Sequence, residues 1–398
     1  MGEKERPRWK RWGLRALVAT PLLGIFMWFA VHHIPGVGPA VANSLRAAFG
    51  NEFVAWLEDT VYGVEDWVNR QTKADAPPEP LWEVPSASSP RPTTVVASAA
   101  PAEAAAPPFR PADVGPVHET FATPGDGRWV PFSEPRTPDD TSYAVKTFLH
   151  PDAGRSWAVV AVVAFDLSRV ELHPVAGRYE PKSKTPEAKD YQRPAVVPKS
   201  DYGRLIAAFN GGYKSTHGTY GMKIDGVTLV PGRPLACTIA RDASGALLIR
   251  PWETIRERAA DFAWFRQTPI CMYDEGTAHP ALSVKTVTWG ASSVSKTTVI
   301  RRSAIGLDEN RKVLFVGIGD HVTGKAIAEA MSHAGAHYVA QLDVNFSFPK
   351  FLLYDWANAE NTALKAIPLT ERFEYEPDQY VGTRSQRDFF YLTRRAQP

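Results

Sequence analysis

The sequence has few cysteines and almost no net charge. Two cysteines among 398 residues, Cys237 and Cys271, are too few for a disulfide framework or a thiolate zinc site. A single bridge and two ordinary buried thiols are both compatible with the sequence. The formal net charge of +2 leaves no chain-wide basic footprint of the kind that nucleic-acid binding requires. Nucleic acid is therefore not an expected partner.

Familiar catalytic motifs are incomplete. Residues 319–325 have the spacing of a phosphate-binding loop, but Ala326 occupies the position of the Mg²⁺-binding Ser or Thr. Residues 293–296 fit the S-x-x-K pattern without its companion Lys-Thr-Gly strand. His333 and His337 have the spacing of a zinc-protease pair, yet no Glu follows His333. These gaps argue against a nucleotide-binding loop, a penicillin-recognising enzyme and a zinc protease.

What the sequence does contain is sharply divided along the chain. Residues 1–15 form a basic segment, and the following run Ala16–Val31 contains no charged residue. With its flanks, the segment 16–34 approaches the ~20 residues needed to cross a bilayer. The positive-inside rule then predicts a single-pass membrane protein with a cytoplasmic N-terminus and a periplasmic or extracellular C-terminal domain. An uncleaved signal anchor is the favoured interpretation, and a signal peptide with a cleavage pattern at residues 40–42 is the alternative.

Two further segments follow this anchor. Over 47–70, apolar residues recur at helical spacing and acidic residues occupy the opposite face, which predicts an amphipathic juxtamembrane helix. Such a helix either packs on its own protein or binds a partner. Residues 75–116 contain 11 prolines and 10 alanines, so we expect an extended and largely disordered linker there.

The remaining residues, 117–398, have the pattern of one folded domain. One helix is expected to follow Thr323 and to stop near Gly335, and a weaker one is expected over 253–266. The predicted fold class is mixed α/β (α+β), a strand-rich single ectodomain with a mixed sheet. Strands are expected near residues 143–149, 157–165, 168–175, 205–209, 222–230, 235–240, 246–250, 298–306, 313–318, 337–342 and 387–393.

Three stretches of this domain place polar residues at strand ends. A buried strand runs into Asn210–Tyr213, where paired glycines let the backbone approach a ligand closely. Arg301 and Arg302 open a second strand, and Asp343 ends a third one that follows a strand–helix unit. We expect these stretches to converge on one hollow.

These pieces, in this order, resemble the phosphodiester glycosidase family, that of N-acetylglucosamine-1-phosphodiester α-N-acetylglucosaminidase, over about residues 140–392. The resemblance rests on collinearity, and it has one departure. The family has glycines and serines after its Leu-Asp, whereas Val344 and Phe346 follow Asp343 here and would occupy space that a glycine turn leaves open. The matching segments are Asn210–Tyr213, Gly221–Gly226, Pro269–Gly276, Arg302–Asp308 and Thr323–Asp343.

The resemblance implies a site for a sugar 1-phosphodiester. Asp343 would be the carboxylate at the anomeric carbon, Arg302 would bind the phosphate, and Asn210 would hydrogen-bond the substrate. A divalent cation is compatible with such a site, with Asp320 and Asn345 as candidate ligands, although no ligand spacing demands one. Further expected substrate-binding residues are Gly211, Gly212, Tyr213, Lys223, Asp225 and His217.

Two functions remain open at this point. The first is a membrane-anchored, exported hydrolase or transferase that acts on glycosyl phosphodiesters of envelope or extracellular glycans. The presence of Asn210, Arg302 and Asp343 favours it. The second is a catalytically inactive glycan-binding or envelope-scaffolding protein with the same fold, which the altered turn after Asp343 favours.

Overall fold

The structure is a computed structural model that describes residues 37–84, 109–132, 143–283, 299–345, 347–354 and 364–395. The predicted basic segment 1–15 and membrane helix 16–34 lie outside the described residues. Within the described ranges, no helix combines the length and the apolar character that crossing a bilayer requires. The chain divides into two units, Met1–Glu58 and Asp59–Pro398.

Helix α2 (Val37–Thr72) spans the residues 47–70 for which a helix is predicted. It is interrupted at Gly50, whose φ of 83° lies in the left-handed region that glycine tolerates best. Within the second unit, the acidic face of α2 packs on the folded domain. Asp66 accepts hydrogen bonds from Arg155 Nε and Nη2 at 2.7 and 2.8 Å, and Glu65 Oε1 lies 3.2 Å from His321 Nε2. The contact of the helix with a partner stays a prediction.

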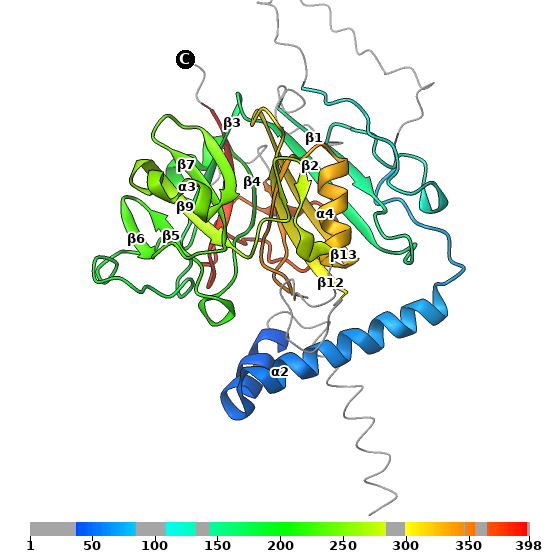
Figure 1. Ribbon diagram of the computed structural model, residues 1–398, viewed down its shortest axis with the longest axis horizontal. Coiled ribbons are helices and arrows are strands. Elements are labelled where there is room, and N and C mark those ends of the chain that lie inside the picture. Colours follow the sequence, from blue (N-terminus) through cyan, green and yellow to red (C-terminus); the bar gives the residue numbers. More distant parts are fainter. Residues whose placement is uncertain are drawn as a thin grey trace, which may run out of the picture. The chain divides into compact units, whose positions relative to one another are not determined.

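Three sheets build the second unit (Figure 1). The first has the order β1-β2-β13-β12-β14-β10-β11, the second β16-β15-β4-β17-β3, and the third β6-β5-β9-β7-β8. In chain order the strands are β1 (Ala144–Leu149), β2 (Val159–Asp166), β3 (Val170–Val175), β4 (Leu205–Asn210), β5 (Met222–Ile224), β6 (Val227–Val230), β7 (Cys237–Asp242), β8 (Leu247–Pro251), β9 (Phe262–Thr268), β10 (Tyr273–Asp274), β11 (Thr277–Ala278), β12 (Ile300–Leu307), β13 (Val313–Val322), β14 (Tyr338–Gln341), β15 (Phe351–Tyr354), β16 (Ala366–Pro368) and β17 (Phe389–Arg394).

Helices are few in this unit, so the prediction of a strand-rich mixed fold is confirmed. Besides the end of α2, the α-helices among its described residues are α3 (Trp252–Ile255) and α4 (Gly324–His333), and the 3₁₀ turns are η1 (Glu119–Phe121), η3 (Lys199–Arg204), η4 (Ser215–His217), η5 (Arg256–Asp261) and η6 (Pro280–Leu282). Helix α4 matches the helix predicted after Thr323. The Thr323 side chain caps it by accepting a hydrogen bond from the Ala326 amide at 3.0 Å.

The sheet type differs from the expected mixed sheet. Every strand pair within the three sheets is antiparallel among the described residues. Strands β13 and β14, which α4 connects, do run in the same direction. However, β12 lies between them and is antiparallel to both. The crossover helix therefore produces no adjacent parallel pair.

The helix predicted over 253–266 is wrong over its last part, residues 262–266. Residues 252–261 form α3 and η5, but β9 begins at Phe262 and lies at the centre of the third sheet, between β5 and β7. Its aromatic residues fit a pleated, buried surface better than an isolated helix. The sequence patterns also missed the short strands β10, β11, β15 and β16.

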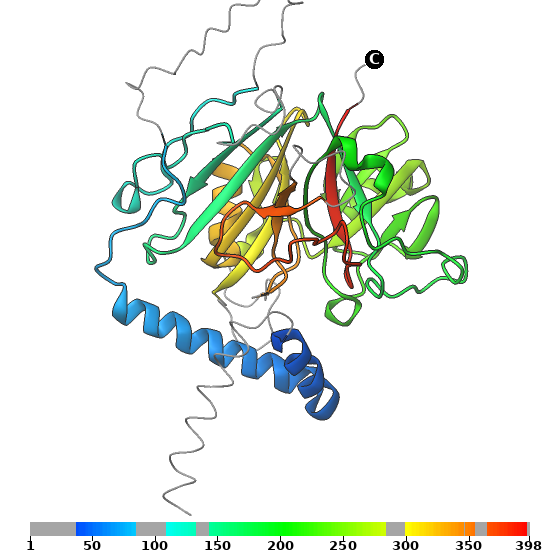
Figure 2. The same ribbon diagram turned by 180° about the vertical axis from the view of Figure 1, so that it is seen from behind.

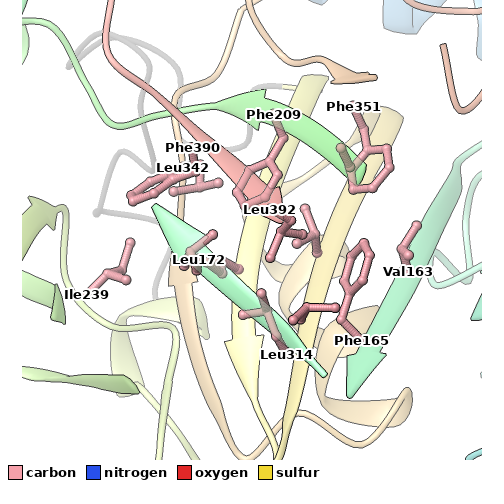
Figure 3. Close-up of a cluster of buried hydrophobic side chains, with 14 of the residues drawn as sticks. Val163, Phe165, Leu172, Phe209, Ile239, Leu314, Leu342, Phe351, Phe390 and Leu392 are labelled. Atoms are coloured by element: carbon pink, nitrogen blue, oxygen red, sulfur yellow. The ribbon is translucent and has the colours of Figure 1, made fainter. Parts of the chain in front are cut away.

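The main core lies where the sheets meet. Phe165 and Leu314 of the first sheet face Phe209 and Phe351 of the second, with Ile239 of the third sheet nearby (Figure 3). Each of these side chains is almost fully buried, and burying one such side chain is worth roughly 1.5–3 kcal/mol. In both ribbon views, β17 (red) lies between the yellow strands of the first sheet and the green strands of the third (Figures 1 and 2). Residues that precede β17 are thus close to all three sheets.

The two cysteines, left open by the sequence, form a disulfide. Cys237 begins β7 and Cys271 follows β9, and their Cα atoms are 4.6 Å apart. The bridge closes a segment with a sequence separation of 34 residues that includes the whole of β9. A loop of that size corresponds to a stabilisation of about 4 kcal/mol in the chain-entropy description.

The predicted linker over 75–116 is ordered at both described ends, while residues 85–108 lie outside the description. Trp82 packs against the main core, with its ring edge-on to Phe148 and Lys146 Nζ 4.3 Å from its centroid. On the other side, Phe109 and Val114 pack against the cluster beneath α4. These large apolar residues give the Pro/Ala-rich segment contacts that its overall composition does not suggest.

Candidate functional site

The three polar stretches predicted from the sequence meet at one place. The Asp343 amide donates to the Gly211 carbonyl oxygen at 3.0 Å. Asn210 Nδ2 donates to Ser303 Oγ at 2.8 Å and to the Asp343 carbonyl oxygen at 3.3 Å. Ser303, the neighbour of Arg302 on β12, also donates to the Asp343 carbonyl oxygen. The end of β4, the middle of the first sheet and the end of β14 therefore form one buried junction.

The paired glycines allow a close approach of backbone to side chains. A Cβ at Gly211 would lie 2.2 Å from Asp388 Oδ2, and one at Gly212 would lie 2.8 Å from Arg266 Cζ. The Gly211 amide donates to the Asp388 carbonyl oxygen at 3.1 Å, and the Gly212 amide donates to Asp388 Oδ2 at 3.0 Å. Both N–H groups, expected to hold a substrate, are thus used within the protein.

Arg266 and Asp388 form a buried ion pair below these glycines. Arg266 Nε and Nη2 donate to the two Asp388 carboxylate oxygens at 2.8 and 3.0 Å. Its remaining donors reach the carbonyl oxygens of Tyr213, Tyr220 and Gln267. Each nitrogen of this guanidinium therefore has an acceptor, which is the condition under which a buried charge is tolerated.

Asp343 makes a second ion pair, with Arg387. The Arg387 Nη1 donates to Asp343 Oδ2, and the Val344 amide donates to Asp343 Oδ1 at 3.0 Å. Burial raises the pKa of Asp343, the charge of Arg387 acts in the opposite direction, and nearby Asp388 raises this pKa further. The Asp343 side chain is 3% exposed, whereas that of Arg387 is 15% exposed. Arg387 therefore lies on the outer side of this pair.

Arg302, expected to bind phosphate, lies deeper. It is 1% exposed, and its Nε donates to the Val322 carbonyl oxygen at 3.0 Å. Burial lowers the pKa of Arg302 to about 10. Next to it, the buried Tyr213 hydroxyl accepts a hydrogen bond from Gln341 Nε2. Arg302, Tyr213 and Gln341 are therefore buried and bonded within the protein.

The other predicted substrate residues lie outside this group of contacts. Lys223 Nζ donates to the carbonyl oxygens of residues 259 and 260, at 3.4 and 3.2 Å. Asp225, at the turn between β5 and β6, is exposed and accepts from the Tyr191 hydroxyl at 2.7 Å. His217 is exposed in η4. The structure thus brings together Asn210, Gly211, Gly212, Tyr213, Arg302 and Asp343, but not Lys223, Asp225 and His217.

The two candidate metal ligands have protein partners. Asp320 lies 3.2 Å from both Arg301 Nε and His321 Nδ1, and Asn345 Oδ1 accepts from the Tyr62 hydroxyl at 3.3 Å. Although burial opposes it, His321 and Arg301 lower the pKa of Asp320 to about 2. In the described part of the chain, no three His, Cys, Asp or Glu side chains are grouped as a metal site would require.

Sequence reasoning missed the residues that complete the junction. Arg387 and Asp388 were included in an expected strand over 387–393, and Arg266 in an expected helix. A signal was present, because the charged pair 387–388 directly precedes the apolar run that begins β17. Charged residues at the mouth of a buried strand are the same pattern that singled out Asp343.

No family model and no curated protein matches the sequence. Three solved structures illustrate what the chain is similar to in shape. The catalytic domain of zebrafish N-acetylglucosamine-1-phosphodiester alpha-N-acetylglucosaminidase has a TM-score of 0.42 at 15% identity, over 66% of this chain and 85% of that chain. A hypothetical protein from Synechocystis has 0.36 at 11%, over 69% and 64%. A putative exported protein from Burkholderia pseudomallei has 0.27 at 10%, over 59% and 74%. These likenesses are too slight to identify a family.

Proposed function

We propose that the chain is a membrane-anchored, exported hydrolase or transferase that acts on glycosyl phosphodiesters of envelope or extracellular glycans. The observation that carries this proposal is the junction itself. It joins one buried carboxylate, Asp343, to the guanidinium of Arg387, and the neighbour of the buried Arg302, Ser303, donates to the Asp343 carbonyl oxygen. A carboxylate next to cations is the combination that a sugar joined to phosphate calls for.

The chemistry would need little from the protein beyond these groups. In hydrolysis, the bond between the anomeric carbon and the phosphate oxygen breaks, the oxygen of water bonds to that carbon, and the proton that this water loses passes to the departing phosphate monoester. The phosphate monoester leaves with the bonding electrons, and since it is a good leaving group it needs no strong acid. Asp343 would stabilise the positive charge that develops at the anomeric carbon. The cations would hold the phosphate, and Asn210 would fix the carboxylate through its hydrogen bond to the Asp343 backbone.

The localisation is part of the proposal. The basic segment 1–15 followed by the apolar run 16–34 supports a cytoplasmic N-terminus and a periplasmic or extracellular domain. The disulfide between Cys237 and Cys271 supports the same placement, because such bridges persist in oxidising compartments.

One observation favours a second candidate, a non-catalytic glycan-binding or scaffolding protein. Asp343 is 2% exposed, and Val344, which follows it, is 5% exposed. A carboxylate enclosed in this way can hold the fold together without meeting a substrate.

Sugar release separates the two candidates. The full chain in detergent or vesicles is incubated with a panel of aryl- and nucleotide-linked sugar phosphodiesters, and the released sugar is quantified. We expect Asp343→Asn to lower turnover by about 10²–10³-fold, as loss of a charge-stabilising group does. Asp190→Asn, which changes an exposed aspartate, is the matched control and should turn over normally.

The outcomes are distinct. Equal turnover by the wild type and Asp343→Asn would remove the assignment of Asp343. No turnover across the panel, with glycan binding retained, would favour the scaffolding function instead.

A further inference from the structure

Arg387 uses fewer of its donors than the buried Arg266 does. Within the described part of the chain, the Arg387 side chain donates from Nη1 to Asp343, and its Nε–Nη2 edge has no acceptor. The face of the guanidinium stacks on Phe348, 3.2 Å from the ring centroid. Its side chain keeps 15% of its surface exposed. A stacked guanidinium with one unused edge, on a side chain that is partly exposed, is oriented but not saturated.

That edge has a definite chemical preference. Nε and Nη2 are two parallel donors whose spacing matches two oxygens of one phosphate or sulfate group. Stacking on Phe348 fixes the plane of the guanidinium, so less side-chain freedom is lost when an anion binds. Arg266, in contrast, already donates to five oxygen acceptors, so none of its guanidinium nitrogens remains for a ligand.

We propose that Arg387 is the phosphate-binding residue of this site, taking the anion on its Nε–Nη2 edge while its Nη1 holds Asp343. A single side chain then sets the separation between the phosphate and the carboxylate. The inference rests on the proposed function for its choice of ligand. It replaces Arg302 in the direct role, because Arg302 is 1% exposed.

The same contact favours the charged form of Asp343. The charged and titratable groups that face it are Arg387 and Asp388 before β17, Lys214 after β4, and the hydroxyls of Tyr213 and Tyr380. Burial and Asp388 raise the pKa of Asp343, while Arg387 and Lys214 lower it. Removing the positive charge of Arg387 should therefore move the titration of Asp343 to higher pH.

Sulfate is a suitable probe, because it has the oxygen geometry of phosphate and does not titrate near neutral pH. Its binding to the full chain is measured by calorimetry against chloride at equal ionic strength. We expect Arg387→Gln to weaken sulfate binding at least tenfold, and Arg387→Lys to weaken it about three- to tenfold, because lysine keeps the charge but loses the paired donors. Arg384→Gln, an exposed arginine three residues away, is the matched control and should bind sulfate normally.

A second readout separates positioning from mere folding. The titration of Asp343 is isolated as the difference in proton uptake between each protein and the same protein carrying Asp343→Asn. We expect the midpoint to lie at higher pH in Arg387→Gln and to return toward the wild-type value in Arg387→Lys. Circular dichroism melts show which variants are folded.

Three results would overturn the inference: sulfate binding by folded Arg387→Gln equal to that of the wild type, equal weakening by Arg384→Gln, or an unmoved Asp343 titration. The proposed function fails separately. Arg387-dependent sulfate binding without any sugar release supports the anion site and removes the hydrolase. Sugar release without Arg387-dependent sulfate binding supports the hydrolase and removes the anion site at Arg387.

Discussion

Arg387 and Asp388 are neighbours in the chain, yet they belong to two ion pairs of opposite character. Asp388 is 4% exposed and is bound by the Nε–Nη2 edge of Arg266 and by the Gly212 amide. Arg387 touches Asp343 through one nitrogen and keeps an open edge. We call the Arg266–Asp388 pair closed, because each nitrogen of its guanidinium has an acceptor. We call the Arg387–Asp343 pair incomplete, because one edge of its guanidinium has none. The difference suggests that the closed pair builds the junction and that the incomplete pair serves a ligand.

The physical reason lies in the cost of removing charges from water. A fully buried pair is tolerated only when every donor and acceptor is satisfied, since each unsatisfied one adds a desolvation penalty. The Arg266–Asp388 pair meets that condition, and it also orders the backbone of Gly212 and Tyr213. The Arg387–Asp343 pair does not meet it, and its outer member remains in contact with solvent.

The largest expected change in the free energy of unfolding comes from breaking the closed pair. Asp388→Asn leaves the Arg266 charge buried without a counter-charge. We expect the free energy of unfolding to fall by about 3–5 kcal/mol, the usual consequence of removing one partner of a buried pair. Urea unfolding at pH 7 measures it, with Asp190→Asn as the exposed control. A loss below about 1 kcal/mol would show that the two pairs do not differ in the way described.

A third group of charged side chains is more exposed than either of these ion pairs and extends the comparison. His321 lies between Asp320 and Glu65 and is 24% exposed. Burial alone would lower the pKa of His321, but the two carboxylates raise it to about 9. Because this value exceeds the unfolded one, the stabilisation is complete below about pH 6.5 and is lost as the pH rises to about 9.

We therefore expect the wild type to lose about 2–3 kcal/mol of unfolding free energy across that window from this cluster. His321→Gln should show a flatter profile. Urea unfolding at pH 6 and pH 9 compares the two proteins. The control is His118→Gln, which changes a ring that contacts the Pro151 carbonyl oxygen. An equal fall in stability in the wild type and His321→Gln would exclude the cluster as its source.

The comparison also shows which contacts of the junction can be predicted from the sequence and which cannot. Asn210 and Asp343 could be predicted as neighbours because each follows a strongly apolar run, and such strands end where the core ends. The partnership of Arg266 with Asp388 spans 122 residues and depends on which sheets pack together. No local pattern encodes that. For the same reason the antiparallel order of β13, β12 and β14 was missed, because a strand–helix–strand pattern does not reveal a third strand between its two.

The smallest expected change in the free energy of unfolding comes from breaking the incomplete pair. The pKa of Asp343 is raised in the folded protein, so its buried charge costs stability once the pH rises above the unfolded value of about 3.8. Asp343→Asn removes that cost, and the Arg387 that it leaves can be solvated. We expect the unfolding free energy at pH 7 to be unchanged or higher by up to about 1 kcal/mol. The difference from the wild type should shrink as the pH falls below the unfolded value of about 3.8, where Asp343 becomes protonated in both states. Urea unfolding of the two proteins at about pH 7 and about pH 3 measures this. A loss of 3 kcal/mol or more, equal to that of Asp388→Asn, would mean that both pairs are structural and that the carboxylate of Asp343 is not held ready for a ligand.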